Sequence, residues 1–287
     1  MRGYAMETGD KGIAELVDLS GRCAVITGGS QGFGAAIARR MGEAGATVVA
    51  AARSLDKAQN VAASIPDGRG FAIRVDVADH DSILNLVAEA QELTGRIDVF
   101  VNNAGAFSNF LLDEMPPEEF QRVINTNITG SFLCAQAAAR AMRADGRGGV
   151  IINMASVDSF QPSSPGLIHY ITSKHALIGL TRALAMELAP WGIRVNAICP
   201  GASLTEGVVD FIKAVAPHGI DVEAEFAGIV DHVPLGRLCS PDDVAIATLF
   251  LASGLSSFVT GTSLTVDGGI LAQPMEGYPE DYGPDAD

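Results

Sequence analysis

The sequence predicts an α/β fold, a Rossmann-type doubly wound parallel sheet of about seven strands with helices on both faces. Short aliphatic runs alternate with longer amphipathic segments such as 35–43, 82–93 and 241–251, as in successive βαβ units. The runs are apolar at consecutive positions, which is typical of strands that are covered on both faces. The expected strands are residues 23–27, 47–51, 70–75, 99–101, 150–153, 194–198 and 263–266.

The composition limits the partners and the compartment. The formal net charge of −15 disfavours a nucleic acid or an anionic membrane as partner, because both would repel the chain. The four cysteines are scattered without a C-x-x-C pair, which is typical of a reduced, cytoplasmic protein and does not indicate a metal site. The N-terminus is unlike a signal peptide, and no apolar run approaches the roughly 18 residues that a membrane-spanning helix needs.

A single catalytic domain is expected over residues 19–272, because neither an internal repeat nor an interdomain linker interrupts the pattern. An N-terminal extension, residues 1–18, precedes it. Residues 203–234 form a long interval with no clear strand, which is typical of a lid or substrate loop. Residues 273–287 carry acidic side chains and no basic ones, which favours a poorly ordered tail over a segment that packs on a neighbouring subunit.

A glycine-rich turn follows the first expected strand. Its sequence is Thr27-Gly28-Gly29-Ser30-Gln31-Gly32-Phe33-Gly34, and a helical pattern begins directly after it. Glycines let the backbone turn tightly and approach a pyrophosphate, while the start of a helix offers free N–H groups and a partial positive charge. The position of this turn favours nucleotide binding over an ordinary strand–helix connection, although its spacing differs from G-x-G-x-x-G.

The ordered motifs resemble the single-domain branch of the short-chain dehydrogenases/reductases, from about residue 19 to residue 269. The glycine turn matches that family's Thr-Gly-x-x-x-Gly-x-Gly motif, and residues 102–105 match its Asn-Asn-Ala-Gly motif. Residues 200–201 resemble its nicotinamide-side turn, and residues 266–269 resemble its closing strand. The resemblance implies that a nicotinamide cofactor contacts Gly28, Ser30, Gln31, Gly32, Phe33, Gly34, Arg53, Asp76, Val77, Asn103, Ala104, Gly105, Tyr170, Lys174, Pro200, Gly201, Ser203 and Thr205.

The end of the second strand bears on the choice between NAD(H) and NADP(H). NAD selection usually requires an acidic side chain there, which accepts hydrogen bonds from the adenosine ribose. Here Ala52 stands at that position and Arg53 follows, so a 2′-phosphate meets a guanidinium instead of a carboxylate. This favours NADP(H). The alternatives are that Arg53 is merely solvated and that NAD(H) is used, and Gln31 supplies no second basic residue.

The proposed proton-transfer group is Tyr170, four residues before Lys174 and therefore on the same face of a helix. Tyr-x-x-x-Lys alone is a common pattern, but the family resemblance adds Ser156 and Asn127 to a catalytic tetrad. Asn125 competes with Asn127 on sequence alone. Ser156 lies 14 positions before Tyr170, one more than is common in the family, and the intervening segment is expected to absorb the extra residue as a loop.

Hydride transfer at a carbinol carbon requires a proton to move at its oxygen. A free tyrosine, with a pKa of about 10, is a poor base at neutral pH. The resemblance implies that Lys174 and an oxidised nicotinamide lower the pKa of Tyr170, and that Lys174 also holds the nicotinamide ribose. It implies that Ser156 donates a hydrogen bond to the substrate oxygen and that Asn127 anchors a water that relays protons to Lys174.

Four histidines and Asp158 lie near these motifs or in the expected lid, but the sequence assigns them no definite role. His169 and His175 flank the start of the expected helix, and packing or solvation is the favoured interpretation of both. His218 and His232 fall in the expected lid. Asp158 is a candidate polar contact in the substrate pocket, with surface solvation about as probable.

The function predicted is an NADP(H)-preferring oxidoreductase that acts on a secondary alcohol or its ketone, with a small-molecule and possibly hydrophobic substrate. A nucleotide-sensing regulator and an epimerase or dehydratase on the same fold are the alternatives. The resemblance implies a homotetramer that pairs through helices near 126–143 and 170–188. Alanines at 135, 137, 138, 139 and 141 permit close helix contact, although packing within one subunit explains them almost as well.

Overall fold

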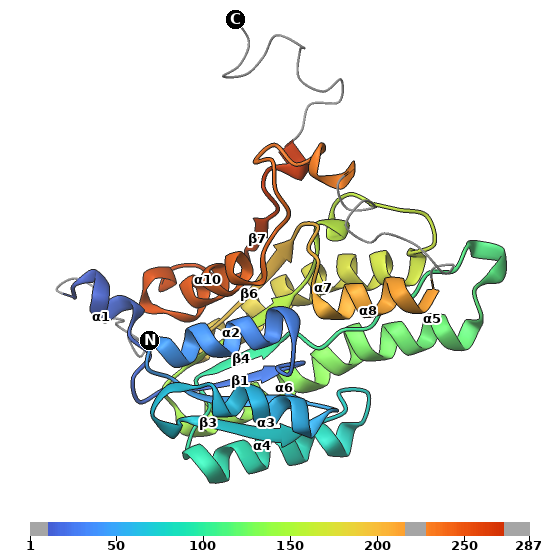
Figure 1. The fold of residues 1–287 in the computed structure, drawn as a ribbon. Helices are drawn as coiled ribbons and strands as arrows, with labels where there is room; N and C mark the ends of the chain where they lie inside the picture. Colours follow the sequence, from blue (N-terminus) through green and yellow to red (C-terminus); the bar gives the residue numbers. More distant parts are fainter. Residues whose placement is uncertain (1–10, 216–227, 273–287) are drawn as a thin grey trace, which may run out of the picture.

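A computed structural model describes residues 11–215 and 228–272 of the chain (Figure 1). Its centre is one parallel sheet of seven strands in the order β3-β2-β1-β4-β5-β6-β7. The order reverses between β1 and β4, which is the doubly wound topology that places ligands beyond the carboxyl ends of the strands. The predicted fold class is confirmed.

Each predicted strand is present, with boundaries within one or two residues of those expected. The apolar runs of the five inner strands lie buried between two layers of helices, which is why they lack the alternation of a half-exposed strand, whereas the edge strands β3 and β7 are only partly buried. The strands are β1 (Cys23–Thr27), β2 (Thr47–Ala52), β3 (Gly70–Arg74), β4 (Val99–Asn102), β5 (Gly149–Met154), β6 (Ile193–Pro200) and β7 (Ser263–Val266).

Helices cover both faces of the sheet. One core joins the sheet to α2 (Gly32–Glu43), α3 (Leu55–Ala63) and α10 (Pro241–Ala252). A second core joins the opposite face to α4 (His80–Thr94), α6 (Gly130–Asp145) and α7 (Ile168–Leu188). Further α-helices are α1 (Ile13–Val17), α5 (Pro117–Ile124) and α8 (Glu206–Val215).

Local sequence explains several helix boundaries. Asp79 caps α4 by accepting from the backbone N–H of Asp81 at 2.9 Å, and the helix ends at Gly95, whose φ of 73° suits glycine. Ser240 and Asp243 form a capping box at the start of α10. These contacts satisfy backbone groups that the helices leave without partners at their ends.

Five of the six alanines of α6, at 135, 137, 138, 139 and 141, are buried within one subunit and belong to its core. Their small size lets the helix lie close to the sheet, so they give no support to a subunit interface. The expected extension contains α1, and Leu16 of that helix lies against Gly254. The expected lid contains α8, but its residues 216–227 and the expected acidic tail, 273–287, lie outside the described residues.

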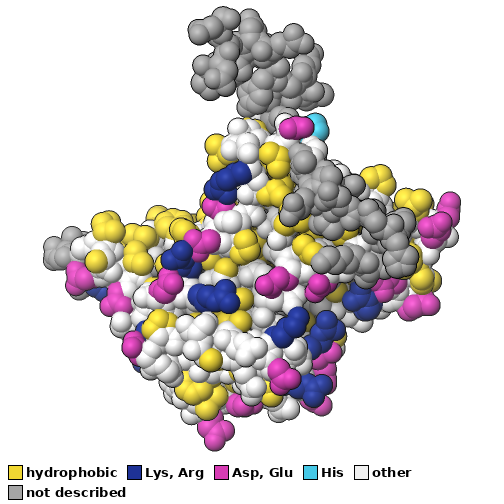
Figure 2. All heavy atoms as spheres, viewed as in Figure 1, with side chains coloured by type: hydrophobic (Ala, Val, Ile, Leu, Met, Phe, Trp, Pro, Cys, Tyr) yellow, Lys and Arg dark blue, Asp and Glu magenta, His cyan; other side chains and the backbone are white. Residues whose placement is uncertain are grey.

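Polar groups at the amino ends of the strands are bound within the fold. Asp98 precedes β4, accepts from the backbone N–H of Cys23 at 2.9 Å and pairs with Arg96. The guanidinium of Arg194, near the start of β6, donates to the carbonyls of Leu251, Ser253 and Val259 and to the hydroxyl of Ser256. These contacts tie the sheet to the end of α10. On the face shown in Figure 2, acidic and basic side chains are interspersed.

Candidate active site

Two glycine-containing motifs join beyond the carboxyl end of β1. Gly28 has a φ of +64°, and a Cβ there would lie 2.8 Å from the Asn103 side chain. The Asn103 amide donates to the carbonyls of Thr27 and Gly28 at 2.9 and 3.1 Å. The Thr27 hydroxyl in turn accepts from the backbone N–H groups of Asn103 and Ala104. The turn after β4 therefore holds the glycine turn after β1 in place, and the two can approach this closely because Gly28 has no side chain.

The start of α2 binds an anionic group. The backbone N–H of Gly32 donates to a carboxylate oxygen of Glu206 at 3.1 Å, although the two residues are 174 positions apart. Thr205 lies beside Gly32, 3.3 Å from where a Cβ would stand. A carboxylate at this position shows that the helix N-terminus has a donor suited to a phosphate oxygen.

A pocket runs from this helix start across the ends of β1, β2, β3 and β4. It is lined by most of the predicted cofactor residues, namely Gly28, Ser30, Gln31, Gly32, Phe33, Arg53, Asp76, Val77, Asn103, Ala104, Gly105 and Thr205. Gly34 supports it from beneath, because a Cβ there would lie 2.2 Å from the Gly28 carbonyl oxygen. Pro200, Gly201 and Ser203 are outside this lining, and Gly201 packs instead on Asp267.

The structure adds a cation that the sequence analysis missed. Lys57 lies in the first turn of α3, lines the same pocket as Arg53 and donates from Nζ to the Gln31 side chain at 3.1 Å. Ala52 is buried at the end of β2. The available signal was the position of Lys57 at the start of the helix that follows β2, close in sequence to Arg53.

The residues around this pocket fit a nicotinamide dinucleotide. Its floor is glycine, its helix start already holds a carboxylate, and Ser203 has a buried hydroxyl with no hydrogen-bond partner within the described part of the chain. Such a cofactor, when bound, supplies or accepts the hydride.

Tyr170 and Lys174 lie one turn apart on α7, as predicted. Lys174 Nζ is 5.4 Å from the centre of the Tyr170 ring and donates to the carbonyl of Met154 at 2.6 Å. Burial lowers the pKa of Lys174 to about 8, and burial raises the pKa of Tyr170 to about 12. A hydrogen bond with Ser156 acts in the opposite direction on Tyr170. Burial outweighs this hydrogen bond, and the effect of Lys174 on a site that contains an oxidised nicotinamide stays a prediction.

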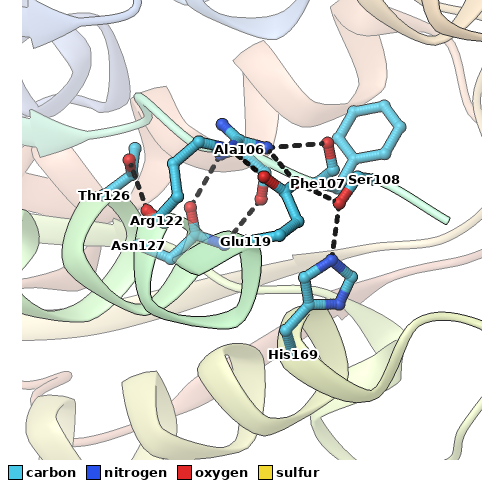
Figure 3. A network of polar contacts seen from close by, with 8 residues as sticks. All are labelled: Ala106, Phe107, Ser108, Glu119, Arg122, Thr126, Asn127 and His169. Carbon is cyan, nitrogen blue, oxygen red and sulfur yellow. Dashed lines mark hydrogen bonds and ion pairs between the residues drawn. The ribbon is translucent and has the colours of Figure 1, made fainter. Parts of the chain in front are cut away.

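Asn127 rather than Asn125 faces the site. Both residues lie in a π-helical turn, Asn125–Thr129, between α5 and α6, but only Asn127 is buried, whereas Asn125 accepts from the Gln121 side chain. Asn127 accepts from the backbone N–H of Ala106 at 2.7 Å and donates to the Ala106 carbonyl (Figure 3). It also donates to the Ser173 hydroxyl. A Cβ on Gly105 would lie 3.6 Å from Asn127 Oδ1 and 3.9 Å from Lys174 Nζ, so both side chains border the space above Gly105.

His169 takes part in a hydrogen-bonded chain that the sequence analysis did not predict (Figure 3). The Ser108 hydroxyl lies 2.6 Å from His169 Nε2 and donates to Glu119, which pairs with Arg122. Because the hydroxyl has one proton, His169 donates from Nε2. The chain links the start of α7 to the loop after β4 and to α5. It also fixes Phe107, whose ring meets the Tyr170 ring edge-on.

The segment between Ser156 and Tyr170 contains a short helical turn, Val157–Ser159 (η4), and then a loop. Within the turn, Asp158 is buried and its carboxylate accepts from the Ser156 hydroxyl at 3.2 Å. The Ser159 hydroxyl donates to the backbone carbonyl of Lys174, which ties the turn to α7. The extra residue is thus accommodated while Ser156 stays close enough to Tyr170 to lower its pKa, against the effect of burial.

Comparisons with known proteins agree with this geometry. A family profile described as enoyl-(acyl carrier protein) reductase matches residues 28–271. An L-rhamnose 1-dehydrogenase (NAD(P)(+)) from Azotobacter vinelandii is 38% identical over 255 residues, which cover 86% of this chain and 95% of the relative. A short-chain dehydrogenase/reductase structure from Mycobacterium marinum is 41% identical, with a TM-score of 0.82 over 90% of this chain and 99% of that one.

A third match has a bound cofactor. It is a structure from Beutenbergia cavernae, assigned as a NAD(P)-dependent gluconate 5-dehydrogenase and containing NADP at low occupancy. It is 37% identical, with a TM-score of 0.80 over 90% of this chain and all of that one. The chain belongs to the short-chain dehydrogenase/reductase family. It is an NAD(P)-dependent oxidoreductase that transfers a hydride between nicotinamide and a secondary alcohol or its ketone.

Proposed function

We propose that this oxidoreductase prefers NADP(H), that Tyr170 is its general acid and base, and that the pocket residues described above hold the cofactor. The observation that carries the preference is the pair of cations at the end of β2. Arg53 and Lys57 line the pocket where an NAD-selective site would have a carboxylate, and Ala52 occupies that position. A 2′-phosphate there gains charge-assisted hydrogen bonds from both.

The pyrophosphate would take the donor on Gly32 that Glu206 now holds, and Asp76 and Val77 would border the adenine. Ser203, whose buried hydroxyl has no partner among the residues that the structure describes, would border the nicotinamide together with Pro200 and Gly201. Lys174 would hold the nicotinamide ribose.

In alcohol oxidation, Tyr170 takes the hydroxyl proton while Ser156 donates a hydrogen bond to the substrate oxygen. Burial raises the pKa of Tyr170 to about 12. Its phenolate would therefore need positive charge nearby, which the ammonium of Lys174 and an oxidised nicotinamide would supply. Protons would leave through a water held between Asn127 and Lys174, above Gly105.

Other properties of the protein are part of the same proposal. Residues 203–234 would close over the substrate, within a single catalytic domain of residues 19–272. Exposed apolar side chains on α6 (Phe132) and α7 (Met186) support a homotetramer, which light scattering tests. The four unpaired cysteines support a cytoplasmic location. None of the helices in the described residues combines the length and the apolar composition needed to cross a bilayer.

The test is a fluorescence titration of the purified chain with NADPH and with NADH. Arg53→Gln should weaken NADPH binding by roughly tenfold and leave NADH binding unchanged, because only NADPH has the phosphate. Arg74→Gln is the matched control, since Arg74 ends the neighbouring strand, is exposed and does not line the pocket. Equal or tighter binding of NADH to the wild-type chain would reverse the proposed preference.

A further inference from the structure

Asp158 is a buried carboxylate inside the active site that the proposed mechanism does not use. The residue is 7% exposed. Its Oδ2 accepts from the Ser156 hydroxyl at 3.2 Å, and its own backbone N–H donates to that hydroxyl at 3.1 Å. The position of Asp158 is thereby fixed beside the group that is proposed to bind the substrate oxygen.

The carboxylate has few partners for a buried charge. Its Oδ1 accepts from the backbone N–H of Ser163 at 2.9 Å, and no ion pair to Asp158 occurs among residues 11–215 and 228–272. A carboxylate can accept about four hydrogen bonds. Two positions are filled, both by uncharged donors, and a buried charge with open acceptor positions is unfavourable.

The present hydrogen bonds also conflict with the proposed role of Ser156. A hydroxyl has one proton, and that of Ser156 points to Asp158. Ser156 therefore does not donate to a substrate oxygen while it donates to the carboxylate. If a donor group on the substrate binds Asp158 Oδ2 in place of the Ser156 hydroxyl, the Ser156 proton becomes available for the reacting oxygen.

We propose that Asp158 selects substrates with a hydroxyl on the carbon next to the reacting one, that is, vicinal diols and α-hydroxy ketones. The proposal rests on the proposed function, since it places the reacting oxygen at Ser156 and Tyr170. A neighbouring hydroxyl lies about one hydrogen-bond length from that oxygen, which brings it within reach of Oδ2. Substrates with a carboxylate or phosphate at that position are repelled by the same charge.

Asp158 also shapes the loop before α7 through its bond to Ser163, and two variants separate the roles. Asp158→Asn keeps an oxygen acceptor for the Ser163 N–H but removes the charge. Asp158→Ala removes both. A purely structural role predicts a normal Asn variant, and an Ala variant that loses melting temperature and all activities alike.

The experiment compares trans-1,2-cyclohexanediol with cyclohexanol, and propane-1,2-diol with 2-propanol, as substrates of the wild-type chain and both variants. The wild type should prefer each diol in kcat/KM. That preference should fall about 10- to 100-fold in Asp158→Ala and by a smaller factor in Asp158→Asn, as expected for hydrogen bonds to a charged group. Melting temperature and NADPH affinity should stay unchanged in the Asn variant.

A diol preference that is the same in all three proteins, or absent from the wild type, would overturn the proposal. A stronger preference for trans-2-aminocyclohexanol than for the diol would mean that Asp158 selects a cationic donor rather than a hydroxyl. That result would also overturn the proposal. Calorimetric binding of each diol and mono-alcohol to the NADPH complex gives a readout without turnover. If no alcohol is oxidised but the diol binds in an Asp158-dependent way, the proposed function fails while the inference about Asp158 stands.

Discussion

At each end of the sheet a cation is buried without a carboxylate partner in the described residues. The two cations differ in how many hydrogen bonds the surrounding fold gives them. Arg194, at the amino end of β6, is 7% exposed and donates to four oxygen atoms of the fold. Lys174, at the carboxyl ends of the strands, is 5% exposed and has one hydrogen bond, to the carbonyl of Met154. Burial lowers the pKa of both, to about 10 and about 8 respectively.

The difference separates a structural charge from a functional one. The donors of Arg194 bind carbonyls at the end of α10, so its charge stabilises the fold locally. The ammonium of Lys174 keeps donors beside the space above Gly105, where a ligand can use them. Arg194 also has one buried donor, Nε, without a partner in the described residues, but only the donors of Lys174 border space that a ligand can enter.

The largest effect is expected for Tyr170→Phe. Removal of the hydroxyl should lower kcat by about 1,000-fold, within the range for loss of a general acid or base. NADPH affinity should change little, because the ring and its contact with Phe107 remain. Steady-state kinetics and a fluorescence titration measure the two quantities. Turnover within a few-fold of the wild type would exclude Tyr170 as the proton-transfer group.

Replacing each buried cation by methionine should give opposite results. Arg194→Met should lower the free energy of unfolding by roughly 3 kcal/mol, because it leaves buried carbonyls without donors. Lys174→Met should lower kcat by about 100-fold with little loss of stability, because a desolvated charge is removed. Urea unfolding and steady-state kinetics distinguish them. Equal losses of unfolding free energy in the two variants would contradict the distinction between a structural Arg194 and a functional Lys174.

The pH dependence of stability tests the burial of Lys174 directly. Its folded pKa of about 8 lies below the ordinary lysine value of 10.5, so the unfolded chain holds more protons between these values. The penalty for the buried charge is complete below pH 8 and is relieved as the pH rises towards 10.5. Relative to Lys174→Met, the wild type should gain about 2–3 kcal/mol of unfolding free energy over this window, measured by urea unfolding. A constant difference would mean that the ammonium is well solvated.

The smallest effect is expected at the start of α2. Glu206→Gln removes a carboxylate that occupies the proposed phosphate donor on Gly32. NADPH and NADH should both bind about three- to fivefold more tightly, because a neutral amide competes less with the cofactor phosphate for the Gly32 N–H than the carboxylate does. Glu43→Gln, also exposed but away from the pocket lining, is the control. Weaker binding in Glu206→Gln would instead indicate that Glu206 helps to hold the closed site.

The sequence alone determined the elements and the motifs that depend on near neighbours. Consecutive apolar runs predicted the strands, the glycine turn predicted the start of α2, and a spacing of four put Tyr170 and Lys174 on one face of α7. Backbone conformation and periodicity are local properties, which is why they are visible in the residues themselves.

Only the tertiary structure decided which distant groups meet. It bound Asn127 to Ala106 and Ser173, and it assigned five alanines of α6 to the core of one subunit. It also brought Glu206 to Gly32 and buried Asp158 against Ser156. Burial and pairing depend on how separate elements pack, and neither composition nor spacing records the neighbours that a side chain acquires from another part of the chain.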